Sequence, residues 1–159
     1  MPIEPMIAAG ALSVSQMVGQ TPSLFRINFL AVIVAAVAGF AIGAVWYSPV
    51  LFAKPWMAAH GFTLESMAAM RSTMARSYAI SFACLLVMAA VLAALLGRTG
   101  IVGAMHGARL AAFIWLGFAA TIGLTANVYA KRPRSLFFID AGHQLVYMTV
   151  MGAILAAWR

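Results

Sequence analysis

The chain has 159 residues, of which 65% are hydrophobic and 8% are charged, whereas an ordinary soluble domain is about 45–50% apolar and about 25% charged. This composition excludes a soluble domain, because so few charges could not cover a water-exposed surface, and it suits an exterior that faces the lipid bilayer. The net charge is +7, but the basic residues are scattered between apolar segments, where they contact lipid headgroups and set topology, so we expect no nucleic-acid partner.

The N-terminal residues 1–25 are expected to form a tail or an interfacial segment, and residues 26–159 a four-helix transmembrane domain. Prolines and glycines interrupt the first segment. Its only charged residue is Glu4, so it lacks the basic start of a cleavable signal peptide.

Four apolar segments are each long enough to cross the roughly 30 Å of hydrocarbon in a bilayer as a helix. They predict an all-α fold: a polytopic membrane protein with four transmembrane helices in a small bundle. The expected spans are about 27–47, 77–96, 104–130 and 135–158. Between the first two spans, hydrophobic residues at helical spacing predict a short amphipathic helix on the membrane surface; they are Leu64, Met67, Met70 and Met74.

The even number of spans places both termini on one side of the membrane and the two polar connections on the other. The basic residues on the side of these connections are Lys54, Arg71, Arg76, Lys131, Arg132 and Arg134. Those on the side of the termini are Arg26, Arg98, Arg109 and Arg159. Because basic residues favour the cytoplasm, we predict cytoplasmic loops and external termini.

Small residues at helical spacing predict where helices approach closely. In lipid, close packing rather than apolar burial holds helices together. The first span contains Ala35, Gly39 and Gly43 at steps of four, and the fourth contains Gly152. We expect these residues at helix contacts, either within the bundle or at a dimer face.

Asp140 is an acidic residue about one and a half turns into the fourth span. A carboxylate there is costly and by default marks a functional site or a buried pair. His143 and Gln144 share its helix face. Two interpretations are open: a proton relay or acid–base pair of Asp140 with His143, or an ion pair that locks the loop to the helix. The basic partners considered for that pair are Lys54, Arg132 and Arg134.

The topology brings the start of the fourth span into the same half of the membrane as the ends of the first and third spans. We therefore expect a candidate functional cluster of polar and aromatic residues in that half. Its members are Trp46, Tyr47, Ser48, Lys54, Trp56, Asn127, Arg132, Asp140 and His143. This half of the molecule is where a ligand pocket is expected.

The residues predict no catalytic set, no metal site and no cofactor. Asp140 and His143 offer two metal ligands, and His60 is the only other histidine on that side, whereas zinc takes three or four ligands. The single cysteine, Cys84, cannot form an intramolecular disulfide. No serine has a Gly-x-Ser-x-Gly context, and no phosphate loop or dinucleotide fingerprint is present.

Two blocks of the sequence are distinctive. The first is Trp46-Tyr47-Ser48-Pro49 with Phe52 and Lys54-Pro55-Trp56, preceded by Asn28. The second is Arg132-Pro133, Ile139-Asp140-Ala141-Gly142, Met151-Gly152-Ala153-Ile154-Leu155 and Trp158. They resemble a bacterial membrane family catalogued as domain of unknown function 1761. The resemblance covers residues 28–158, apart from His143, and implies a four-helix membrane fold in a bacterial inner membrane, but no activity.

Three functions fit these observations. The first is a non-enzymatic membrane protein that works as an oligomer or as an accessory subunit of a membrane complex, which the small size and the glycine spacing favour. The second is a small oligomeric transporter or channel that uses Asp140. The third is a membrane-embedded enzyme that acts on a lipid or quinone beside the aromatic residues.

Overall fold

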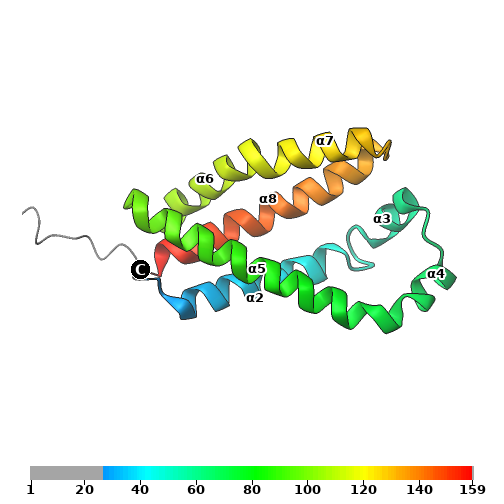
Figure 1. Cartoon of the computed structure of the whole chain (residues 1–159), viewed down its shortest axis with the longest axis horizontal. Helices are drawn as coiled ribbons and strands as arrows, with labels where there is room; N and C mark the ends of the chain where they lie inside the picture. The colour runs from blue at the N-terminus through cyan, green and yellow to red at the C-terminus, as the bar shows by residue number, and fades with distance from the viewer. Residues whose placement is uncertain (1–26, 159) are drawn as a thin grey trace, which may run out of the picture.

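The structure is a computed structural model that describes residues 27–158 (Figure 1). Within these residues there is no strand, and four helical spans are long and apolar enough to cross a membrane. The predicted all-α, multi-pass membrane fold is thus confirmed. The expected segment 1–25, together with Arg26 and Arg159, lies outside the described residues.

The first span is α2 (Phe29–Trp46). Asn28 caps it, because its Oδ1 accepts a hydrogen bond from the Ala31 amide at 3.1 Å. The Asn28 Nδ2 also donates to the Trp158 carbonyl oxygen at 3.3 Å. The start of α2 and the end of the last helix therefore meet at one end of the molecule (Figure 1).

A tight turn follows α2. The Phe52 amide donates to the Trp46 carbonyl at 3.0 Å, and the Leu51 and Ala53 amides donate to the Ser48 carbonyl at 3.1 and 3.2 Å. Pro49 lies within this turn, and proline cannot continue a helix. The chain then enters a short helix, α3 (Ala53–His60), which bends back toward the bundle.

The connection to the second span contains two short helices where the sequence predicted one. Gly61 has φ of 70° and ends α3, because glycine adopts this left-handed conformation without strain. Thr63 and Ser66 then form a capping box that starts α4 (Leu64–Ala69). The second span, α5 (Arg71–Thr99), begins earlier than expected and includes Met74 in its first turns.

The third span is continuous but changes its winding. It consists of α6 (Ala104–Ile114), a π-helical segment η1 (Trp115–Ala120) and α7 (Thr121–Tyr129). Gly103 has φ of 95° and starts it. The Gly103 amide donates to the Ala156 carbonyl at 3.0 Å, which ties this start to the end of the fourth span.

The fourth span, α8 (Arg134–Ala157), is the centre of the bundle and contacts α2, α5 and α6. Gly152 and Gly107 mark the closest approach of α8 and α6. A Cβ on Gly152 would lie 2.5 Å from the Gly107 carbonyl oxygen and 2.7 Å from the Ala111 Cβ. Backbone thus meets backbone here, which only glycine allows.

The small residues of α2 face the same core. Ala35 is fully buried. A Cβ on Gly39 would lie 3.2 Å from both Leu85 Cδ2 and Met151 Sδ. Large apolar side chains instead cover the outside, for example Phe29, Phe113 and Phe118, which are 75%, 74% and 67% exposed. An apolar exterior over a core of small residues is the arrangement that a bilayer favours.

Candidate functional site

Three aromatic side chains from the first block hold the start of α8. The Tyr47 hydroxyl donates to Asp140 Oδ1 at 2.9 Å, and the Trp56 indole nitrogen donates to the same oxygen at 3.1 Å. The Trp46 indole nitrogen donates to the Ile139 carbonyl at 3.1 Å. We call Trp46, Tyr47 and Trp56, with the Asp140 that they surround, the aromatic clasp.

The turn after α2 builds the clasp. It packs the Phe52 ring against Trp46, with ring centroids 4.7 Å apart and the ring planes tilted by 31°, and it directs α3 so that Trp56 reaches α8. Gly142 leaves room on the other side, because a Cβ there would lie 3.3 Å from Trp46 Cζ2. The indole therefore rests directly on the backbone of α8.

A second layer of rings covers the clasp. The His60 ring lies 4.2 Å from the Trp56 ring and 5.2 Å from the Phe62 ring, against which it stacks. The His60 Nδ1 is 3.1 Å from the Trp56 carbonyl oxygen. His60 thus supports Trp56, and within residues 27–158 no three His, Cys, Asp or Glu side chains gather closely enough to hold a metal ion.

His143 extends the clasp into the bundle. Its Nδ1 lies 3.4 Å from the Tyr47 hydroxyl, and its ring packs against the Tyr47 and Tyr147 rings with centroids 4.9 and 5.0 Å away. The Nε2 is buried and, among the described residues, has no hydrogen-bond partner. It faces α2 at Gly43, where a Cβ would lie 3.2 Å away.

The electrostatics favour a protonated Tyr47. Burial, and then the neighbouring Asp140 carboxylate that accepts its hydrogen bond, raise the pKa of the Tyr47 hydroxyl above its ordinary value of 10.0. The hydroxyl therefore remains a donor to Asp140 at physiological pH. His143, Tyr47 and Asp140 form a continuous chain of polar atoms, which is the geometry that a proton relay requires.

The basic partners considered for Asp140 are not the ones it has. Within the described chain its hydrogen-bond donors are Tyr47 and Trp56, which are neutral. Lys54 is exposed on α3 and has no part in the clasp. The loop-to-helix lock expected from an ion pair is therefore made by hydrogen bonds from aromatic residues.

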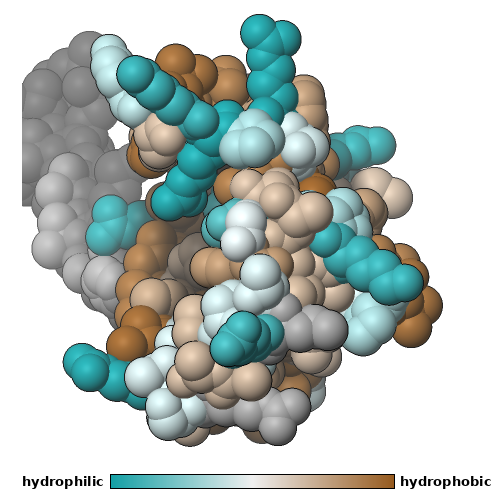
Figure 2. Space-filling view, turned by 90° about the vertical axis from the view of Figure 1, so that its right-hand side faces the viewer, coloured by the Kyte–Doolittle hydropathy of each residue, from teal (hydrophilic) through white to brown (hydrophobic). Residues whose placement is uncertain are grey.

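The remaining members of the predicted cluster lie beside the clasp. Asn127 and Arg132 line a hollow of about 290 Å³ between α7 and α8, together with Asp140 and Gln144. Ser48 contributes its carbonyl oxygen to the turn after α2. Figure 2 looks onto this end of the molecule, where hydrophilic side chains gather around the ends of the helices.

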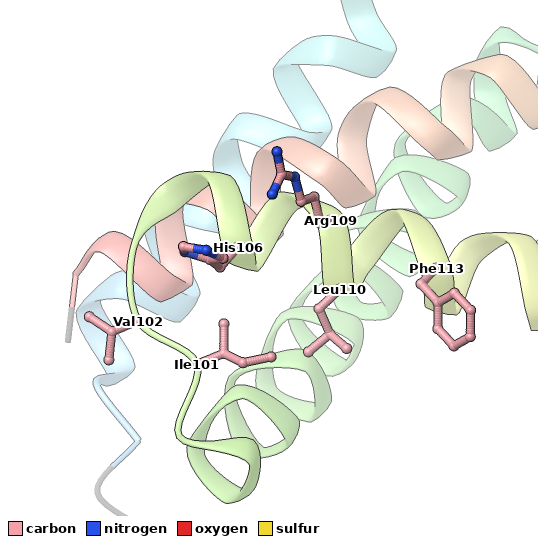
Figure 3. Close-up of a pocket in the computed structure, with 6 residues that line it drawn as sticks. All are labelled: Ile101, Val102, His106, Arg109, Leu110 and Phe113. Carbon is pink, nitrogen blue, oxygen red and sulfur yellow. The ribbon is translucent and has the colours of Figure 1, made fainter.

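The opposite end of the molecule has a larger hollow, of about 460 Å³, at the connection of α5 and α6. Its walls are mainly apolar and include Ile101, Leu110 and Phe113. His106 and Arg109 lie at its edge, and Figure 3 shows the Arg109 guanidinium pointing away from Ile101 and Leu110. Arg109 suits an anchor at the membrane boundary better than a binding group.

Three parts of the site could not be identified as contacts from the sequence. Phe52 and Gly142 were noted only as part of the resemblance, yet both position Trp46. The Ile139 carbonyl could not be predicted as an acceptor, because a backbone acceptor has no signature in the side-chain pattern. The sequence signal for this contact was an aromatic-rich block after the first span together with the small residues Ala141 and Gly142 in the fourth span, against which an aromatic ring can pack.

Comparison with known protein families identifies a match over most of the chain. Residues 30–156 match the family described as protein of unknown function (DUF1761). The chain belongs to the DUF1761 family. Neither a curated protein nor a solved structure matches it. The two blocks that carry the resemblance to DUF1761 are far apart in sequence, and in the structure they meet at the aromatic clasp through Trp46, Tyr47, Trp56 and Asp140.

Proposed function

We propose that this DUF1761 protein is a non-enzymatic membrane protein of the bacterial inner membrane. It acts within an assembly, either as a homo-oligomer or as an accessory subunit of a larger complex. The observation that carries the proposal is the outward face of the third span. Only 11% of an 18-residue apolar stretch of that span is buried inside the chain, against 33% for the corresponding stretch of α8.

Small side chains make this outward face suitable for a helix partner. A Cβ on Gly117 would meet nothing within 4 Å, and Thr121 and Thr125 follow at steps of four and are exposed. Both threonine hydroxyls bond to carbonyl oxygens of their own helix, at 2.9 Å. These small residues lie among exposed large side chains such as Phe113 and Phe118, and small residues let a partner backbone approach closely in lipid.

The aromatic clasp supports the non-enzymatic part of the proposal. Asp140 Oδ1 accepts two internal hydrogen bonds, so that oxygen is engaged in holding α3 and the end of α2 against α8. Tyr47 is held protonated, which leaves it a donor and not a nucleophile. In this proposal the clasp fixes the loop-side end of the bundle.

Cysteine crosslinking in native membranes tests the proposal. In a Cys84→Ser background, Gly117→Cys should crosslink on oxidation, either to a second copy or to one other protein in a fixed ratio. Val87→Cys is the matched control, because Val87 is 63% exposed and lies near the middle of α5. No adduct from Gly117→Cys, or equal adducts from both positions, would contradict an interface on the third span.

A second candidate is a small oligomeric transporter or channel, and one observation favours it. The chain from His143 through Tyr47 to Asp140 ends at the hollow that Asp140 lines. Proton flux into liposomes that contain the protein is the test. Flux that Asp140→Asn removes would support this candidate, and the absence of Asp140-dependent flux would count against it.

A further inference from the structure

The hollow between α7 and α8 contains two opposite charges that are not paired. Arg132 and Asp140 both line it, and Asn127 and Gln144 add amide groups, while Phe137 forms part of its apolar wall. Among the described residues, neither Arg132 nor Asp140 has an ion-pair partner. A charge near a membrane is costly without a partner, so this arrangement calls for one.

Asp140 has one carboxylate oxygen available. The Tyr47 and Trp56 hydrogen bonds both end on Oδ1. Oδ2 accepts no hydrogen bond from the described residues. It is not fully buried either, because the buried polar atoms that lack a partner do not include it. An ionised carboxylate can accept several hydrogen bonds on each oxygen, so Oδ2 can accept one from a ligand in the hollow that Asp140 lines.

The Arg132 backbone is fixed while its side chain is open. The Asn127 amide nitrogen donates to the Arg132 carbonyl at 3.2 Å, and the Arg132 amide donates to the Asn127 carbonyl at 3.1 Å. Lys131 completes the turn with a positive φ of 51°. No hydrogen bond within residues 27–158 holds the guanidinium, so it is available to an anion from outside.

We infer that this hollow binds a zwitterion, whose ammonium group donates to Asp140 Oδ2 and whose phosphate or carboxylate accepts from Arg132. A simple anion or cation would leave one of the two charges unpaired, whereas a zwitterion pairs both. Arginine suits the anionic end, because its planar guanidinium donates two parallel hydrogen bonds. The inference does not depend on the proposed assembly.

The position of the hollow favours a phospholipid headgroup as the source. Arg132 lies in the turn before α8, and Asp140 lies six residues into that helix, about 9 Å along its axis at 1.5 Å per residue. The 24 residues of α8 extend about 36 Å, which exceeds the roughly 30 Å of hydrocarbon, so we expect the turn before α8 and its first residues at the level of the headgroups. Phosphatidylethanolamine carries a phosphate and a primary ammonium, and a free phosphate ester or amino acid of the same chemistry is the other source.

Native mass spectrometry with two lipids tests the inference. The full chain is titrated with dioleoyl phosphatidylethanolamine and dioleoyl phosphatidylcholine, which differ only in the methyl groups on nitrogen. The choline ammonium has no N–H to donate, so the wild type should prefer phosphatidylethanolamine by roughly tenfold, the effect of one charge-assisted hydrogen bond. Equal binding of the two lipids would overturn the inference without any variant.

Three variants assign the two charges. Asp140→Asn should abolish the preference, because the neutral amide does not select an ammonium group. Arg132→Gln, at an exposed position, should weaken both lipids by roughly tenfold. Lys131→Gln is the matched control, since it removes a neighbouring exposed charge that does not line the hollow. An unchanged preference in Asp140→Asn, or equal losses in Arg132→Gln and Lys131→Gln, would contradict the site.

A competition experiment separates the two sources. Excess O-phosphoethanolamine should leave phosphatidylethanolamine bound if the hollow takes an intact lipid, and should displace it if the hollow takes a free zwitterion. Either result supports the zwitterion chemistry once the lipid preference is present. A lipid adduct that persists with no preference between the two headgroups would mean that acyl chains alone hold it, and would contradict the inference.

Discussion

The aromatic clasp predicts a specific non-additivity, because Tyr47 and Trp56 donate to the same oxygen of Asp140. Tyr47→Phe and Trp56→Phe each remove one donor and keep a ring in place. After either change Oδ1 still accepts one hydrogen bond. After both changes the carboxylate oxygen has no donor from the clasp. The second loss should therefore cost more than the first.

The magnitude follows from the chemistry of the two bonds. A hydrogen bond to a charged group contributes about 1.5–3 kcal/mol in water-soluble proteins, whereas hydrogen bonds within membranes average about 0.6 kcal/mol. Since one donor remains in each single variant, we expect each to lower the free energy of unfolding by about 1 kcal/mol. The double variant should lose about 3 kcal/mol, because it leaves a half-buried carboxylate oxygen without either donor.

The assay is reversible unfolding in mixed micelles, followed by circular dichroism because Trp56→Phe alters fluorescence. Tyr78→Phe is the control, since Tyr78 is exposed and the one hydrogen bond of its hydroxyl within residues 27–158 is the weak one to Met74 Sδ at 3.9 Å. That control should change the free energy of unfolding by less than about 0.5 kcal/mol. If the double loss merely equals the sum of the single losses, the shared-oxygen account of the clasp is wrong.

Three further predictions concern the rest of the bundle. Gly107→Ala should lower the free energy of unfolding by about 3 kcal/mol, because its Cβ would meet the Gly152 carbonyl. Gly117→Ala, in open space, should instead raise the free energy of unfolding by up to about 1 kcal/mol. Unfolding in mixed micelles measures both changes. Asn28→Ala should cost about 1 kcal/mol by losing the cap of α2, and hydrogen exchange at the start of α2 should rise. The pKa of Tyr47 is raised in the folded protein above its unfolded value of 10.0, so the free energy of unfolding should be constant below about pH 10. Above that pH it should fall by up to about 1.4 kcal/mol per pH unit. In Tyr47→Phe this fall should be smaller.

The four spans could be predicted from the sequence, because the hydropathy of a segment of about 20 residues is added over all of them and does not depend on which contacts the helix makes. The ends of the helices were less certain. α5 begins at Arg71, before the apolar segment, because the helix continues as an amphipathic extension of the span. Gly61 divides the preceding segment into two helices through its left-handed conformation, which a spacing of hydrophobic residues does not encode.

The candidate site was predicted as a region but not as a set of contacts. Topology alone brings Tyr47, Trp56 and Asp140 to the same end of the bundle. Their hydrogen bonds depend on the turn after α2, whose backbone pattern determines where α3 points. Charge favoured Lys54 as a partner of Asp140, yet Lys54 lies on the exposed side of α3. Water solvates a lysine at that position better than the clasp would.

Of the two glycines at the closest approach of α6 and α8, only Gly152 was predicted from the sequence to lie at a helix contact. Gly152 was expected at a helix contact, whereas its partner Gly107 was not predicted, although Gly103, Gly107 and Ala111 stand at steps of four. One Gly-x-x-x-Gly spacing in a glycine-rich membrane protein is a weak signal. The contact becomes apparent once α6 and α8 are placed side by side and their backbones meet.

The measurement that most directly tests the proposed function is native mass spectrometry of the tagged protein after gentle extraction from its own membrane. The proposal predicts one defined species, either a homo-oligomer or a complex of fixed stoichiometry with a larger partner. Loss of that species in Gly117→Leu, with Val87→Leu unchanged, would locate the contact on the third span. A wild-type protein that is a lone monomer under these conditions would contradict the proposal.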